Sequence, residues 1–131
     1  MNYKGVIIEE SLENKDILND VVILNTKVEQ VTEKHNTPYL QQWTLHTFEV
    51  GEDKAWDIAE KLSKSLDSKH GAWYSDFKNE KFHYIIFRNK IFKIDRSNSE
   101  KYKEVVQYGI SLGIPDYQLD FSPDIKEWKR E

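Results

Sequence analysis

Residues 72–96 read AWYSDFKNEKFHYIIFRNKIFKIDR, and this stretch decides the fold. Aromatic and β-branched residues alternate with polar ones in three short runs, a pattern typical of β-strands. The dipeptides Asn79-Glu80 and Asn89-Lys90 separate the runs where two-residue hairpin loops belong, and asparagine tolerates the positive φ that such loops need. The sequence therefore predicts a three-stranded antiparallel meander.

These two turns also predict which residues of the meander lie side by side, because side chains alternate between the two faces of a strand. With two-residue loops, one face carries a polar row of Asp76, His83 and Arg96 next to apolar rows. The other face carries aromatic, aliphatic and basic residues, namely Trp73, Phe77, Phe82, Tyr84, Ile86 and Lys93. We therefore expect the meander to present two chemically different surfaces.

The chain outside the meander supplies three strands, over residues 3–10, 21–31 and 42–50, and two helices, over about residues 52–68 and 98–112. Consecutive strands joined by short turns favour antiparallel pairing. The predicted fold is α+β. It has a mostly antiparallel sheet of about six strands in the order β-β-β-α-β-β-β-α, with the two helices packed on one face.

Two of these segments carry a clear pattern of faces. In the strand over residues 21–31, Val22, Leu24, Thr26 and Val28 are expected on one face, and Lys27 and Glu29 on the other. In the first helix an apolar stripe at helical spacing is expected to face the core; it consists of Ala55, Ile58, Ala59, Leu62 and Leu66.

The length of 131 residues fits one domain, which we expect over residues 1–121, followed by a polar tail over 122–131. Residues 116–121 are expected to form a last short strand or a docked segment. No apolar run approaches the length of a membrane span, so no membrane partner is expected. The absence of cysteine excludes disulfides and suits a reducing compartment, so we expect a cytoplasmic protein.

The charge of the chain is unevenly distributed. The formal net charge is −4, which argues against a surface that binds nucleic acid over its whole extent. Residues 78–103, however, contain eight basic and three acidic residues, a local balance of +5. Such a segment suits an anionic partner, or an acidic patch on a second copy of the chain.

The row of Asp76, His83 and Arg96 is the candidate catalytic site. A carboxylate beside an imidazole fixes its tautomer and raises its basicity, as a general base requires. A neighbouring arginine can hold a carboxylate or phosphate through its two-pronged donor geometry. The same three residues also fit a structural ion network where the core meets water.

The opposite face of the meander supplies the candidate ligand-binding residues, which are Trp73, Phe82, Tyr84, Arg88 and Lys93. An apolar sheet face must be covered by the chain itself, by a ligand or by another subunit. Our leading hypothesis is a small binding or interaction domain that uses the meander as its recognition surface and forms a homodimer. One alternative is a hydrolase or transferase acting on a small anionic metabolite. A second is a protein that binds single-stranded nucleic acid through stacked bases and cations.

No metal or cofactor is predicted. His35 and His46, together with His83, Asp76 or Glu49, could in principle hold a metal, but no two of them have the close spacing that marks a metal site. Glycine-rich phosphate loops, the dinucleotide-binding fingerprint and the nucleophile-elbow motif are also missing from the sequence. Whether the protein is an enzyme stays open at this point.

Overall fold

The computed structural model describes residues 2–30, 42–67, 73–114 and 118–119. It confirms the predicted fold class, an α+β fold with a six-stranded antiparallel sheet and two helices. The strands are β1 (Tyr3–Ile8), β2 (Val22–Gln30), β3 (Gln42–Val50), β4 (Tyr74–Lys78), β5 (Phe82–Phe87) and β6 (Lys90–Asp95). The helices are α1 (Ala55–Ser65) and α2 (Ser99–Ser111), and short 3-10 helices cover Glu9–Ser11, Lys15–Asn19 and Glu52–Lys54.

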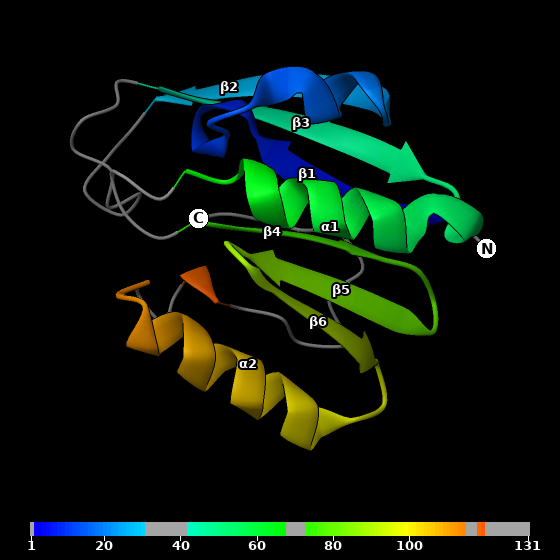
Figure 1. The fold of residues 1–131 in the computed structure, drawn as a ribbon, viewed down its shortest axis with the longest axis vertical. Helices are drawn as coiled ribbons and strands as arrows, with labels where there is room; N and C mark the ends of the chain where they lie inside the picture. Colours follow the sequence, from blue (N-terminus) through cyan, green and yellow to red (C-terminus); the bar gives the residue numbers. More distant parts are fainter. Residues whose placement is uncertain (1, 31–41, 68–72, 115–117, 120–131) are drawn as a thin grey trace.

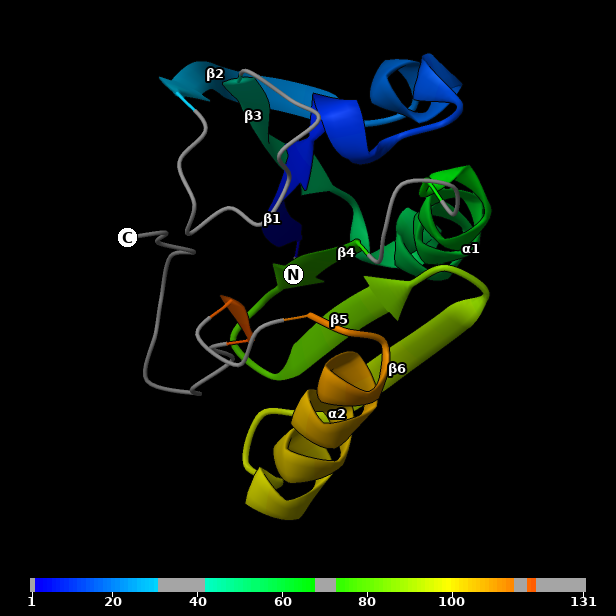
Figure 2. The same cartoon turned by 90° about the vertical axis from the view of Figure 1, so that its left-hand side faces the viewer.

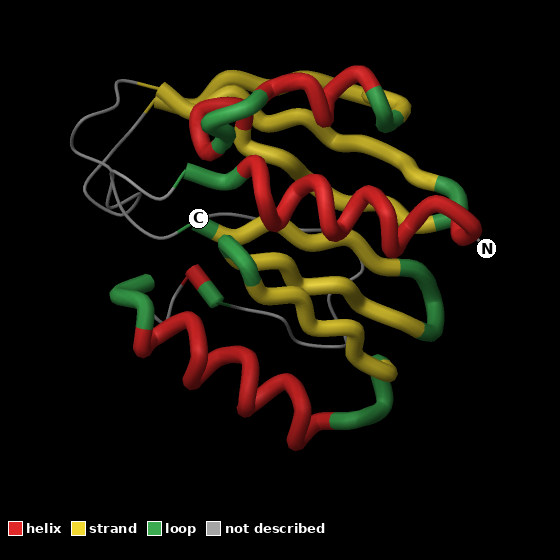
Figure 3. The backbone as a smooth tube through the Cα atoms, in the orientation of Figure 1, coloured by secondary structure: helices red, strands yellow, loops and turns green. Residues whose placement is uncertain are grey.

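The strands lie in the order β2-β3-β1-β4-β5-β6 (Figures 1 and 3). Strands β1 to β3 form one antiparallel half of the sheet, and the meander β4 to β6 forms the other. Only β1 and β4 join the halves, and they pair over three residues on each strand, Lys4–Val6 with Asp76–Lys78. The continuity of the sheet therefore depends on this short pairing.

Gly5 makes that pairing possible because the neighbouring backbone leaves no room for a side chain. A Cβ atom at Gly5 would lie 2.0 Å from the carbonyl oxygen of Asp76 and 2.7 Å from the Cβ of Phe77. Gly5 pairs with Phe48 on β3 and with Phe77 on β4, and these two rings meet edge to face with centroids 5.9 Å apart. The two aromatic side chains thus use the space that the glycine leaves free.

Each predicted loop of the meander is displaced by one residue, which shifts the pairing register by two, while the predicted division of faces is right. The first loop is Glu80-Lys81, because Asn79 precedes it and its side-chain oxygen accepts hydrogen bonds from the backbone N–H groups of Lys81 and Phe82. The second loop ends at Asn89, which has a φ of 60° and precedes β6. A shift of two residues changes the cross-strand partners but returns each side chain to the same face.

The two helices pack on opposite faces of the sheet, so their predicted placement on one face is wrong (Figure 2). Ile86 belongs to the core cluster that contains the apolar stripe of α1, whereas Ile85 belongs to the cluster that contains Tyr102 and Val105 of α2. Adjacent residues of a strand point to opposite faces. Because the meander is apolar on both faces, each face needs its own cover, and one helix supplies each.

The predicted alternation along β2 fails at a β-bulge. The register of β2 against β3 shifts between Ile23 and Asn25, so Val22 lies on the same face as Lys27 rather than on the face of Val28. A bulge inserts one extra residue, and the alternation of faces changes there. The other predicted pattern holds, because every residue of the expected α1 stripe is buried.

The predicted segment 116–121 lies mostly outside the described residues, as does the whole of the predicted tail over 122–131. Of this segment the structure describes Gln118 and Leu119. Leu119 is buried in the cluster beneath α2, where its side chain contacts Gly109. The domain boundary at residue 121 therefore stays a prediction.

Replacing Gly5 with alanine is expected to lower the free energy of unfolding by about 2 kcal/mol or more. The new methyl group would meet backbone of β4, which can move only by opening the β1–β4 pairing. Urea denaturation of parent and variant measures the change.

Gly51→Ala is the matched control for this substitution. Its Cβ would lie 2.8 Å from the carboxylate oxygen of Asp53, the far end of an exposed side chain, and 4.0 Å from the side-chain oxygen of Asn2. Its φ of −67° suits any residue. We expect a change within about 0.5 kcal/mol. Equal losses in the two variants would contradict the role assigned to the β1–β4 pairing.

Candidate functional site

The structure brings Asp76 and His83 into contact on the face of the sheet that α2 covers. Asp76 pairs with Ile85 across β4 and β5, and His83 pairs with Lys78, so the two side chains are diagonal neighbours. The imidazole Nε2 of His83 lies 2.6 Å from Oδ2 of Asp76. The sequence placed these side chains on one face, and the register shift leaves that placement intact.

Tyr102 of α2 completes the contact from the other side of the imidazole. Its hydroxyl lies 3.0 Å from Nδ1 of His83. Burial raises the pKa of the Tyr102 phenol, while the charge of Arg96 and a hydrogen bond with it oppose that rise. The phenol is therefore protonated at neutral pH and can donate to the imidazole.

The direction of the hydrogen bonds follows from what each group can donate. An ionised carboxylate only accepts, so Nε2 of His83 carries the proton that Asp76 binds. In the neutral ring, Nδ1 then accepts from the Tyr102 hydroxyl. Arg96, which only donates, bonds to Tyr102 and also to the backbone carbonyl of Asn79 at 2.7 Å. The chain of donors runs from Arg96 through Tyr102 and His83 to Asp76.

Burial limits what this network can do chemically. The exposed fractions are 5% for Asp76, 2% for His83 and 7% for Tyr102. Both nitrogens of the imidazole have partners, and Arg96 is bonded to the turn that joins β4 and β5. The imidazole is enclosed by its partners in this arrangement, and the network fastens α2 to the sheet through buried hydrogen bonds.

The candidate ligand-binding residues do not form one surface. Trp73 is buried against Trp43, with ring centroids 5.3 Å apart, and Tyr84 is buried within the cluster that α1 covers. Arg88 lies at the end of β5 away from Phe82, about 20 Å along the strand. These positions place most of the predicted recognition face in the core.

Three of the five residues do meet, because Lys93 packs on the rings of Phe82 and Tyr84. The ammonium group of Lys93 lies 4.6 Å from the ring centroid of Phe82 and 5.6 Å from that of Tyr84. Both distances are in the range of cation–π attraction. Arg88 is engaged elsewhere, donating to the carboxylate of Glu13 and to backbone carbonyls at the end of α1.

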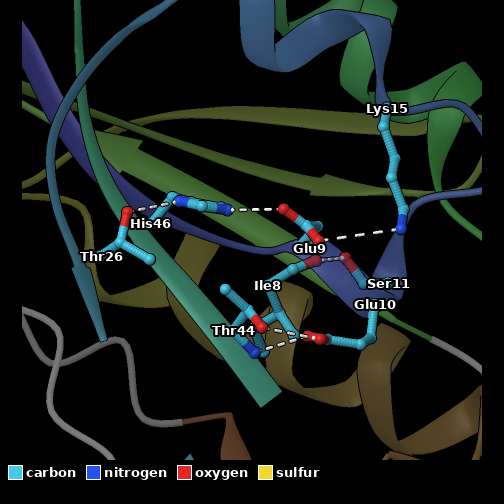
Figure 4. Close-up of polar contacts among 8 residues, drawn as sticks. All are labelled: Ile8, Glu9, Glu10, Ser11, Lys15, Thr26, Thr44 and His46. Atoms are coloured by element: carbon cyan, nitrogen blue, oxygen red, sulfur yellow. Dashed lines mark hydrogen bonds and ion pairs between the residues drawn. The ribbon is translucent and has the colours of Figure 1, made fainter. Parts of the chain in front are cut away.

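A second polar cluster lies on the other half of the sheet, at β2 and β3 (Figure 4). His46 of β3 is bonded through Nδ1 to the hydroxyl of Thr26, its cross-strand partner on β2, at 2.8 Å. Its Nε2 lies 3.0 Å from a carboxylate oxygen of Glu9. Glu10 accepts hydrogen bonds from the backbone N–H and the hydroxyl of Thr44. Together these contacts tie β2 and β3 to the 3-10 helix that follows β1.

Sequence reasoning named His46 but missed its partners, and it missed Tyr102 as a partner of His83. Glu9 follows β1, and Ile7 of β1 pairs with His46, so a correct strand order would have indicated that contact. Tyr102 lies on the buried side of α2 together with Val105 and Gly109. His35 lies outside the described residues.

Comparisons with protein-family models, with curated proteins and with solved structures find no match to this chain. Among the residues that the structure describes, no group of three or more His, Cys, Asp or Glu side chains could hold a metal ion. No helix in this part of the chain is long and apolar enough to span a membrane.

Tyr102→Phe is expected to lower the free energy of unfolding by about 1–3 kcal/mol. The substitution keeps the ring but leaves Nδ1 of His83 without its donor in a buried site. Denaturation monitored by tryptophan fluorescence and by circular dichroism measures the loss.

Tyr108→Phe, on the same helix, is the control. The Tyr108 ring packs edge to face on Phe87 and Phe92, and the variant keeps these contacts. Its stability should change by less than about 0.5 kcal/mol. A Tyr102→Phe variant that is as stable as the parent would argue against a role of this network in holding α2 on the sheet.

Proposed function

We propose that this protein is a small binding and interaction domain and that its recognition surface is the free edge of β2. This proposal keeps the predicted class of function but moves the surface away from the meander. The observation that carries it is the exposure of β2, of which every residue is exposed except Glu29, which is half-buried.

Exposed apolar residues are concentrated on this one strand. Within the described residues, seven large hydrophobic side chains are exposed, and four of them belong to β2. They are Val22 (63%), Ile23 (38%), Leu24 (48%) and Val28 (52%). Grouped apolar residues on a surface favour contact with another polypeptide.

The two edges of the sheet differ in a way that supports an interaction at β2. The other edge strand, β6, exposes only charged residues, Lys90, Lys93 and Asp95, and α2 packs against it. Charged side chains and a covering helix are the usual means by which proteins protect an edge from pairing. On β2 the only exposed charge is that of Lys27.

Among the described strands β2 pairs with β3 alone, so its outer edge faces no other described strand. The outward N–H and C=O groups of an edge strand can accept another strand, and the main-chain hydrogen bonds then give affinity while the side chains give specificity. We propose that the chain functions as a homodimer through this edge. We further propose a cytoplasmic location, which suits a chain without cysteine.

The two rival functions have less support. A hydrolase or transferase that uses Asp76, His83 and Arg96 on a small anionic metabolite would need access to an imidazole that is 2% exposed. A single-stranded nucleic-acid platform would need free cations beside open rings. Lys93 instead packs on two aromatic rings of its own chain, and Arg88 pairs with Glu13.

Val28→Lys is expected to convert a dimeric parent into a monomer. A lysine on the edge adds a charge that must be desolvated when another strand pairs there, whereas it is well solvated in the free chain. Size-exclusion chromatography with light scattering, at micromolar concentrations and above, measures the mass directly.

Ile110→Lys on α2 is the matched control, because it places the same charge at a similarly exposed apolar position, 42% against 52%. This variant should stay dimeric. A parent that is monomeric throughout the concentration range would rule out the homodimer, and a monomeric Ile110→Lys variant would move the interface to α2.

A further inference from the structure

We infer that two copies of this chain pair antiparallel along β2 about a twofold axis at Val28, which makes one continuous twelve-stranded sheet. The inference rests on the proposed interaction at β2 and adds the geometry of that interaction. It is carried by the charge pattern of the strand, by its β-bulge and by its position at the outer edge of the sheet (Figures 1 and 3).

Symmetry restricts how a strand can pair with its own copy. In an antiparallel pair, residues that face each other lie on the same side of the sheet, so one residue must lie opposite itself on the axis. Within the central part of β2 that residue is Asn25, Thr26, Lys27 or Val28. An axis at Lys27 would set two like charges directly opposite each other, which is unfavourable.

The bulge excludes the axes nearest to it. The regular alternation of β2 against β3 is broken between Ile23 and Asn25. An axis at Asn25 or Thr26 would require the second copy to pair across this irregular section. Only the section from Asn25 to Gln30 has an unbroken register, so we place the contact there.

The charges select Val28 from the remaining possibilities. Lys27 and Glu29 lie on either side of Val28 and share a face of the sheet. With the axis at Val28, each Lys27 lies opposite Glu29 of the second copy, so two opposite-charge pairs form. An axis at Thr26 would instead set Glu29 opposite Ile23. The strand is therefore self-complementary only about Val28.

On the other face the same pairing covers the exposed side chain of Val28. Val28 would pack against Val28 of the second copy, between flanking pairs of Thr26 with Gln30. Thr26 is held by its hydrogen bond to His46, which fixes its side chain beside the proposed contact. The cluster around His46 thus positions the strand from within its own subunit.

The chain has no cysteine, so single introduced cysteines report the axis directly. Two cysteines at the residue on the axis face each other at the Cα separation of an antiparallel pair, about 4.5–5.5 Å, which a disulfide can bridge. Val28→Cys should therefore form a covalent dimer under mild oxidation, scored by non-reducing electrophoresis. Thr26→Cys should not, because its two copies would be four residues, about 13 Å, apart along the strand.

Charge reversal gives a second measurement that needs no cross-link. Lys27→Glu alone and Glu29→Lys alone should each weaken the dimer about tenfold or more, because each replaces two attractions with two repulsions. The double variant restores both pairs and should recover the parent affinity. Analytical ultracentrifugation measures the dissociation constants, and circular dichroism checks that each variant is folded.

The outcomes separate this inference from the proposed function. Suppose that the parent is dimeric but the Thr26→Cys variant cross-links, or that the double charge variant does not recover the parent affinity. Either result overturns the axis at Val28 and leaves the interaction domain in place. If the parent is dimeric but neither cysteine variant cross-links and neither single charge variant weakens the dimer, the pairing along β2 is overturned. A monomeric parent overturns the homodimer and with it the pairing.

Discussion

The short pairing of β1 with β4 is the contact on which the rest of the structure depends. It joins two antiparallel halves of the sheet through three residues on each strand, and it exists because Gly5 has no side chain. The rings of Phe48 and Phe77 meet across that position and lie in the core that α1 covers. A wider separation at Gly5 would divide the sheet and open this core at once.

The position of β1 in the middle of the sheet also decides what is exposed. Because β1 pairs on both sides, the free edges fall to β2 and β6. The edge at β6 has charged residues and α2 beside it, whereas β2 is left with apolar residues and one exposed lysine. The fold therefore combines one protected edge with one open edge, and the proposed function follows from that difference.

The buried polar groups of this protein have a structural role, because they hold separate elements together. The contact of Asp76 with His83 has the geometry of a catalytic pair, but Tyr102 and Arg96 complete it from inside the protein. A buried hydrogen-bonded network of this kind favours one arrangement of helix on sheet, because another arrangement would leave buried donors or acceptors unpaired. The same reasoning applies to His46, whose partners Thr26 and Glu9 come from two other elements.

Much of this structure could be predicted from the sequence because periodicity reports which side of a strand or helix is buried. The fold class, the α1 stripe and the faces of the meander were predicted in this way, and the contact of Asp76 with His83 survived a wrong register because a shift of two residues preserves faces. Turn positions were less accurate, because Asn79 acts through its side chain rather than through a positive φ.

What pattern alone could not supply was the arrangement of elements far apart in the chain. The opposite placement of α1 and α2, the bulge in β2 and the donor from Tyr102 all depend on tertiary contacts. The exposure of β2 was hidden for the same reason. Its apolar residues are those of an ordinary half-buried strand, and only the strand order leaves them at an edge.

The central claim is that β2 is the edge through which this protein meets its partner. Hydrogen–deuterium exchange with mass spectrometry, carried out at dilute and at concentrated protein, tests it without any substitution. The account predicts that amides of β2 become more protected as the dimer forms, while those of β6 are unchanged. Unchanged exchange in β2 at a concentration where the chain is dimeric, or added protection in β6 instead, would contradict it.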